Sequence, residues 1–404
     1  MKNQLFSAAL CLGMLSLPVA CQFQVSESAV DDPSAAPADS DGASDSAAGS
    51  RASEIAYVAE LRGWSSSPRV ETSAFGAAQL SFDPHSRTLR YRLQHNLSSA
   101  TQAHIHFGAA GETGAAAYPL LCVSDASAGE LTLSVQDVAN LESGMFYLDV
   151  HSGGHESAEI RGQILHEGEA LYVAELVPAN KGPFAGADVP HNAQLIVDAS
   201  KMGFHYHVST GASLAGTTIQ RGIVGTTSEQ AFALPASPTL DGTLGFRPGD
   251  NEDLVQGRWF INIPSLDDQG TSLVGRLMLP GETLYSAALN ERTSVVGAHA
   301  SGTAQFILAA NRSSIRYELA LFGLSPQVAR VYRNTSNSEG SESFALTLLS
   351  GYSSTPRATA GGLGELGITP SEAADLTSGA LSLSAYDPAI PGAAAGPVSA
   401  VAGY

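Results

Sequence analysis

The chain has 404 residues, of which 44% are hydrophobic and only 15% are charged, so it is long enough to bury several separate cores. A formal charge of -19 argues against a nucleic-acid partner, because no basic surface is present to displace counterions from phosphates. Forty-one glycines and twenty prolines favour short strands and turns over long helices, so the composition predicts an all-β protein.

The N-terminus is typical of an exported protein. In residues 1–20 a lysine precedes an apolar run that is too short to span a membrane as a folded helix, which predicts a signal peptide. Cys21 follows at once, and LPVAC resembles a bacterial lipoprotein signal, although Pro18 stands where leucine is expected. Lipidation of Cys21 would anchor the protein to a membrane. The alternative is ordinary secretion. We therefore expect a cell-envelope location, as an outer-membrane lipoprotein or as a secreted or periplasmic protein.

Residues 21–53 are rich in serine, alanine and aspartate and nearly lack large apolar side chains. We expect a disordered acidic linker, because such a segment cannot bury enough surface to offset its ordering entropy. Apart from Cys21, the mature chain keeps only Cys122, which excludes a disulfide framework and a cysteine-based zinc site. Cys122 lies in the apolar run YPLLCV and is predicted to be a buried core thiol.

One unit occurs three times along the rest of the chain. Its first strand recurs with a period of about 115 residues, as IAYVAEL at 55–61, LYVAEL at 171–176 and LYSAAL at 284–289. Two more strands follow at matching distances in each copy. The sequence therefore predicts three tandem antiparallel Greek-key β-sandwich domains, which we name the first repeat (54–166), the second repeat (167–280) and the third repeat (281–404).

A short acidic segment forms the next landmark of each repeat. Ser134 in the first repeat and Thr369 in the third are typical helix N-caps, which predicts one short helical turn at each place. In all three repeats the segment ends in a leucine three residues before a glycine. The leucine is expected to pin the turn to the core and the glycine to end it in a left-handed conformation: Leu141 with Gly144, Leu254 with Gly257, and Leu376 with Gly379.

Residues 55–165 resemble a CHRD domain, a module named from chordin and also found in bacterial secreted proteins. The resemblance rests on YVAEL, FGAAQLSFD, LRYRL, NLSSATQAHIHFG, FYLDVHS and EIRGQIL. It is weaker over residues 171–279, where SLVGRLML replaces EIRGQIL, and faint over residues 284–404. It implies a sandwich related to that of Cu,Zn superoxide dismutase, whose copper ligands include two histidines one residue apart on a strand.

The segment AHIHFG carries such a histidine pair. Successive side chains of a strand point to opposite faces, so Ala103, Ile105 and Phe107 are expected to face the core while His104 and His106 share the outer face.

The segment FYLDVHS carries a third histidine. The same alternation places Tyr147, Asp149 and His151 on the outer face of that strand. If the two strands are neighbours, three imidazoles converge there, with Tyr147 and Asp149 as supporting groups. Neutral imidazole suits copper or zinc, so His104, His106 and His151 are candidate metal ligands, and His155 in SGGHES is a further one.

The other two repeats keep these strands and lose the histidines. The positions of His104, His106 and His151 are occupied by Thr218, Gln220 and Pro264 in the second repeat and by Arg330, Tyr332 and Tyr386 in the third. Because the fold does not need the histidines, a functional role in the first repeat is favoured. The structural alternative is that the histidines bond to Asp149 or Tyr147 and fix the strand pairing.

The sequence thus predicts an exported module that binds copper or zinc without catalysis. The alternative is a protein- or glycan-interaction module without a metal, and a remote one is dismutase-like activity, against which the missing bridging histidine and disulfide weigh. GLGELG at 362–367 lacks a βαβ context and is expected to be a turn. His205 and His207 share a strand face in the second repeat, where His191 is the nearest further histidine.

Overall fold

The computed structural model describes residues 54–403 except for 122–124, 180–191, 210–215, 225, 227, 236–239, 265–271, 292–299, 325–327, 335–338, 350–357 and 388–389. All described residues belong to one compact unit. The predictions for the signal peptide, for the linker and for Cys21, Cys122 and His191 lie outside the described residues.

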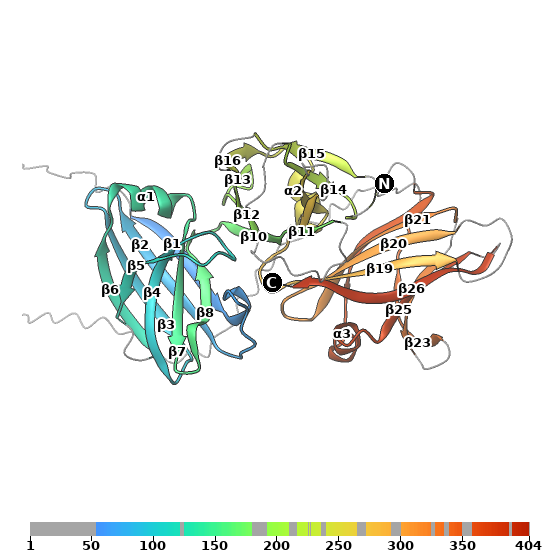
Figure 1. Ribbon diagram of the computed structural model, residues 1–404, viewed down its shortest axis with the longest axis horizontal. Coiled ribbons are helices and arrows are strands. Elements are labelled where there is room, and N and C mark those ends of the chain that lie inside the picture. The colour runs from blue at the N-terminus through green and yellow to red at the C-terminus, as the bar shows by residue number, and fades with distance from the viewer. Residues whose placement is uncertain are drawn as a thin grey trace, which may run out of the picture. The chain divides into compact units, whose positions relative to one another are not determined.

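Strands dominate the described chain, which confirms the all-β prediction. Figure 1 shows those of the first repeat from blue to green. They are β1 (Ile55–Arg62), β2 (Phe75–Asp83), β3 (Thr88–His95), β4 (Ala100–Phe107), β5 (Ala116–Leu120), β6 (Ala126–Thr132), β7 (Phe146–Ser152), β8 (His155–Gln163) and β9 (Leu165–His166), with the 3-10 turn η1 (Gly63–Ser65) and the helix α1 (Val135–Glu142).

The strands of the first repeat form two antiparallel four-stranded layers in the orders β5-β4-β7-β8 and β1-β2-β3-β6. The layers join at one edge, where β1 pairs with β8 through Arg62 and Arg161. Alternate residues of both layers, such as Tyr57, Phe82 and Ile105, are buried together in one core between them. This is a β-sandwich, in which each strand is apolar on its inner face.

The second and third repeats have the same strand order. The second holds β10 (Ala170–Glu175), β11 (Val177–Pro178), β12 (Asn192–Val197), β13 (Gly203–Ser209), β14 (Thr218–Arg221), β15 (Glu229–Ala233), β16 (Leu240–Gly245), α2 (Asp250–Val255), β17 (Trp259–Ile263) and β18 (Leu273–Arg276). Its layers are β15-β14-β17-β18-β11 and β10-β12-β13-β16.

The third repeat holds β19 (Thr283–Glu291), β20 (Ser301–Leu308), β21 (Ser314–Phe322), β22 (Val328–Asn334), β23 (Glu339–Leu346), β24 (Ala360–Gly367), α3 (Pro370–Thr377), β25 (Leu381–Asp387) and β26 (Ile390–Gly403). Its strands run in the order β23-β22-β25-β26-β19-β20-β21-β24. GLGELG lies in β24 and not in a turn, because β21 pairs with it along its length and supplies backbone hydrogen bonds. The second and third repeats each enclose a core of their own.

One glycine fixes the corner of each sandwich. A Cβ added to Gly162 would lie 2.2 Å from the carbonyl oxygen of Glu60, and one added to Gly275 would lie 2.4 Å from that of Glu175. A Cβ at Gly396 would clash with a carbonyl oxygen of β19 in the same way. The last strand therefore passes the first strand so closely that only glycine fits.

The helical turns form in all three repeats, and both predicted N-caps are present. The Ser134 hydroxyl accepts a hydrogen bond from the Asp137 amide at the start of α1. Thr369 and Glu372 make a reciprocal capping box on α3. Helix α2 instead follows Gly249, whose side chain offers no cap. The glycines that follow the three helices have left-handed φ angles, as predicted: Gly144, Gly257 and Gly379. Within the described residues, no helix is long and apolar enough to cross a membrane.

Candidate metal centre

The strands β4 and β7 are neighbours, and their register brings the predicted residues together. His104 pairs with Asp149, and His106 pairs with Tyr147. The core-facing residues of β7 are buried as predicted. Phe107 does not face the core: it is 44% exposed, because it is the last residue of β4 and lies at the rim of the sandwich.

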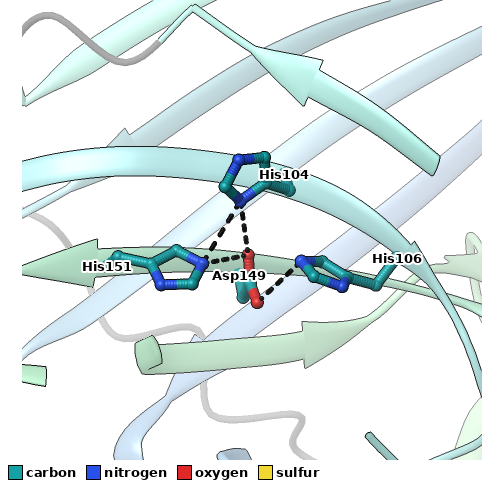
Figure 2. Close-up of side chains that lie close together, drawn as sticks. All are labelled: His104, His106, Asp149 and His151. Carbon is teal, nitrogen blue, oxygen red and sulfur yellow. Dashed lines mark hydrogen bonds and ion pairs between the residues drawn. The ribbon is translucent and has the colours of Figure 1, made fainter. Parts of the chain in front are cut away.

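Four side chains gather on the outer face of this strand pair (Figure 2): His104, His106, Asp149 and His151. One ligand atom from each lies within 4.8 Å of the other three. We name these residues the His/Asp cluster. Asp149 lies at its centre, since its Oδ1 is 3.2 Å from Nε2 of His151 and 3.7 Å from Nδ1 of His104. Its Oδ2 is 3.2 Å from Nε2 of His106.

Backbone carbonyls fix the proton positions of two imidazoles. Nδ1 of His151 lies 2.6 Å from the carbonyl oxygen of Glu156, and Nδ1 of His106 lies 3.0 Å from that of Gly114. A carbonyl oxygen can only accept, so each Nδ1 carries the proton and donates it. In a neutral imidazole with its proton on Nδ1, Nε2 carries a lone pair. The Nε2 atoms of His106 and His151 both point at the Asp149 carboxylate.

This arrangement favours a cation between the imidazoles and the carboxylate. A lone pair that faces a carboxylate oxygen at 3.2 Å is repelled unless a proton or a metal ion lies between them. His106 Nε2 is buried and has no hydrogen-bond partner among the described residues, so its ion contact with Asp149 lacks hydrogen-bond geometry. His104 Nδ1 adds a third nitrogen, 3.2 Å from Nε2 of His151, and can donate a hydrogen bond to it when its own proton is on Nδ1.

The pKa shifts of the four cluster residues reflect the same preference for a cation. Asp149 raises the pKa of His151. Burial lowers the pKa of His106, but the Asp149 carboxylate and the Gly114 carbonyl outweigh it, so the net shift is upward. Burial lowers the pKa of His104. Burial also opposes ionisation of Asp149, yet His106 and His151 hold its pKa down at about 2. The cluster thus keeps a carboxylate and attracts positive charge.

The outer face is covered rather than open, which corrects the expected exposed patch. The side chain of Asp149 is 3% exposed, and those of the three histidines are 13–20% exposed. Tyr147 stacks on His106, and the guanidinium of Arg161 lies 3.3 Å from the centre of the Tyr147 ring. Arg161 is buried as well, and it donates to the carbonyls of Ala109 and Glu112 in the loop that crosses this face.

His155 is not part of the cluster. It is exposed at the start of β8 and pairs with Ser152 across the turn that joins β7 to β8. Tyr147 lies beside the cluster and is not one of its four residues. Its hydroxyl accepts a hydrogen bond from the Gly114 amide, so Tyr147 and His106 both bind the loop at Gly114. The sequence placed Asp149 beside the site as a supporting group. The register shows why it is central, since Asp149 lies directly opposite His104.

The spacing of the cluster suits a small divalent ion. A tetrahedral zinc or copper ion with bonds of about 2.0 Å holds its ligand atoms about 3.3 Å apart. His104 Nδ1, His151 Nε2 and Asp149 Oδ1 are separated by 3.2, 3.2 and 3.7 Å. The N–H groups of His106 and His151 that point away from the cluster are bonded to carbonyls, as is usual for metal ligands. The residues present therefore fit a metal ion.

The equivalent faces of the other repeats lack these groups. In the second repeat, β14 and β17 pair in the same register, and Asn262 occupies the place of Asp149. Gln220 there donates to Thr218, so the two positions that hold histidines in the first repeat bond to each other. In the third repeat, Arg330 and Ser384 stand opposite each other at the equivalent pair.

Comparison with known proteins agrees with the motifs of the first repeat. The family model of the CHRD domain matches residues 57–164, a range that contains the whole His/Asp cluster. Neither the curated proteins nor the solved structures give a significant match. The chain therefore contains a CHRD domain at residues 57–164, and this domain coincides with the β-sandwich of the first repeat.

Proposed function

We propose that the first repeat binds a copper or zinc ion through His104, His106 and His151, with the Asp149 carboxylate as the fourth ligand. One observation supports this most strongly. Two imidazoles, each with its Nδ1 proton held by a carbonyl, direct their Nε2 lone pairs at one buried carboxylate. A metal ion satisfies all of these groups at once, whereas protons bridge both Nε2 atoms to Asp149 only below the raised pKa values of His106 and His151.

A binding role is favoured over catalysis. Three imidazoles and a carboxylate fill the four positions of a tetrahedral site, and a filled site leaves no position for a substrate or a reactive water. Nitrogen and oxygen donors without a thiolate suit zinc or copper(II) better than copper(I). The proposed activity is therefore capture or delivery of the ion.

Metal titration by calorimetry tests the proposal. Wild-type protein should bind zinc or copper(II) with a dissociation constant tighter than about 100 μM, and His104→Ala/His151→Ala should weaken binding at least about 100-fold. His155→Ala is the matched control, because this histidine is exposed and lies outside the cluster. Weaker binding by wild type, or unchanged binding by the double variant, would show that the proposal is wrong.

Metal affinity should also depend on pH. The ion competes with protons for His106 and His151, whose pKa values are raised. Apparent affinity should therefore increase as the pH rises from about 6 to about 8, with protons released on binding. Titration in two buffers of different ionisation enthalpy counts those protons.

The alternative is an interaction module that recognises a protein or a glycan without a metal. In that case the cluster only ties β4 to β7, and removing metal leaves partner capture unchanged. Elemental analysis of protein purified from its native compartment separates the two functions, because metal capture requires a near-stoichiometric ion and the interaction module does not.

We further propose that the protein is exported and anchored in the cell envelope through a lipid on Cys21. The proposal rests on the segment LPVAC after an apolar run. The mass of the mature N-terminal peptide should show a lipidated Cys21, and Cys21→Ser should release the protein from the membrane fraction. An unmodified Cys21 in membrane-free protein would favour ordinary secretion instead.

A further inference from the structure

A cavity of about 200 Å³ lies between the second and third repeats. The second repeat contributes Val177 and Val274 to its wall, and the third repeat contributes Leu284 and Val401. Binding sites for small molecules are commonly of this kind, mostly apolar and placed where two domains meet.

One polar side chain in the wall has an unused acceptor. Gln305, on the face of β20 that points away from the core of the third repeat, is only 6% exposed. Its Oε1 is buried and has no hydrogen-bond partner among the described residues. A buried acceptor without a donor destabilises a protein, so the position implies that a donor is supplied from outside the chain.

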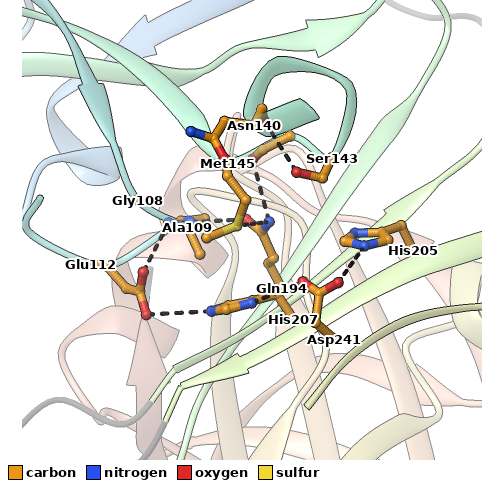
Figure 3. A network of polar contacts seen from close by, with 12 residues as sticks. Gly108, Ala109, Glu112, Asn140, Ser143, Met145, Gln194, His205, His207 and Asp241 are labelled. Carbon is orange, nitrogen blue, oxygen red and sulfur yellow. Dashed lines mark hydrogen bonds and ion pairs between the residues drawn. The ribbon is translucent and has the colours of Figure 1, made fainter. Parts of the chain in front are cut away.

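The junction between the first and second repeats provides an internal comparison. Gln194 occupies in β12 the position that Gln305 occupies in β20, since each pairs with the corresponding residue of the next strand. Figure 3 shows Gln194 in the polar network of that junction. There its Oε1 accepts a hydrogen bond of 2.9 Å from the Ala110 amide, and its side chain is fully buried. The equivalent cavity measures only about 20 Å³.

Several equivalent positions line both cavities, so the tenfold difference in volume has a local cause. Arg161, Val173 and Ala110 line the small cavity, and their counterparts Val274, Ser286 and Val224 line the large one. Arg161 holds the loop over Gln194 by donating to the carbonyls of Ala109 and Glu112. Valine at position 274 has no donor to do this. Ser286 is also smaller than its counterpart Val173, so it fills less of the large cavity.

We propose that this cavity binds a small neutral molecule that is mostly apolar and carries one hydroxyl or N–H group, which donates to Oε1 of Gln305. The volume sets the size: an apolar cavity of about 150 Å³ accommodates benzene, so about 200 Å³ suits a single substituted ring. Neutrality follows from the balance of the walls, because the one carboxylate, of Glu175, and the one guanidinium, of Arg276, leave no net charge to attract an ion.

Ligand-observed NMR and calorimetry with three probes on the full chain test this inference. The probes are 4-methylphenol, toluene and 4-methylbenzoate. We expect 4-methylphenol to bind with a dissociation constant of about 1 mM or tighter. Toluene, which lacks the donor, should bind about fivefold more weakly or worse, and the anion should not compete.

Two variants localise the binding. Gln305→Leu should lower the affinity for 4-methylphenol about fivefold and leave toluene binding unchanged or improved. Ser286→Val installs the residue of the first junction and should weaken both probes by filling the cavity. Gln79→Leu is the matched control, since Gln79 occupies the same strand position in the first repeat and is exposed.

Failure of wild type to bind 4-methylphenol at about 1 mM would overturn the inference, and so would equal affinity in wild type and Gln305→Leu. If Ser286→Val melts at a lower temperature, Gln305→Leu still decides, because the preference for phenol over toluene is read within one variant. The outcome is independent of the metal proposal, because the cavity contains none of the four cluster residues.

Discussion

The strand pair β4/β7 of the first repeat and the strand pair β14/β17 of the second repeat have the same register. Their outer faces differ, because one carries charged and titratable side chains and the other carries uncharged ones. The first presents three histidines around the buried carboxylate of Asp149. The second presents Asn262 at the position of Asp149, with uncharged Thr218 and Gln220 bonded to each other. The carboxylate is lost together with its imidazoles, as expected if the anion is stable there only beside a cation. The scaffold and the charged site are therefore separable.

Substitutions in the scaffold should lower the free energy of unfolding most, and by a similar amount in both repeats. Gly162→Ala and Gly275→Ala place a methyl group against the carbonyls of Glu60 and Glu175, so each should lower the free energy of unfolding by about 3 kcal/mol or more. Urea unfolding measures this. Gly154→Ala, which has open space around it, is the control and should cost little. A large difference between the two buried variants would contradict the common corner geometry.

The charged site should matter only in the first repeat. In metal-free protein, Asp149→Ala removes the anion that two imidazoles share, and we expect a loss of about 2 kcal/mol at pH 6. Asn262→Ala at the equivalent position should cost less than about 1 kcal/mol, because this side chain faces no charged cluster. Chemical unfolding of both variants makes the comparison, and equal losses would contradict the special status of the first-repeat site.

The junction between the first and second repeats should be sensitive to alkaline pH. His207 lies between Asp241 and Glu112, and these carboxylates outweigh its burial and raise its pKa to about 9. Stabilisation by His207 is therefore complete below its unfolded pKa of about 6.5 and is lost as the pH rises through about 9. The difference in stability between wild type and His207→Gln should shrink by about 1 to 2 kcal/mol over that range.

Unfolding by urea at about pH 6 and about pH 9.5 measures this change. His155→Gln serves as the control for a histidine that is exposed. A difference that stays constant with pH would show that the contact of His207 with the two carboxylates does not contribute to stability.

The helix caps should give the smallest effects. Ser134→Ala and Thr369→Ala each remove a side-chain acceptor for the amides at the start of a helix, so each should cost about 1 kcal/mol. The second repeat offers nothing comparable to remove, since Gly249 precedes α2. Thermal unfolding resolves such differences, and a loss well above 2 kcal/mol would mean that these residues do more than cap.

Local pattern determined much of this protein from the sequence. Alternation of apolar residues correctly predicted which residues of β4 and β7 face the core. Phe107 is the exception, because it is the last residue of β4 and lies beyond the edge of the core. Glycine and N-cap chemistry located the helical turns, because these depend on a few neighbouring residues. Comparison of the three repeats also showed that the fold does not depend on His104, His106 and His151.

Only the tertiary structure decided what surrounds those histidines. The strand register placed Asp149 at the centre of the cluster and excluded His155. The carbonyls of Gly114 and Glu156 fixed two imidazoles, and Arg161 held a loop over a face that alternation alone predicted to be open. The cavity beside Gln305 needs two repeats to form. Such contacts join residues far apart along the chain, and strand period carries no information about which distant segments meet.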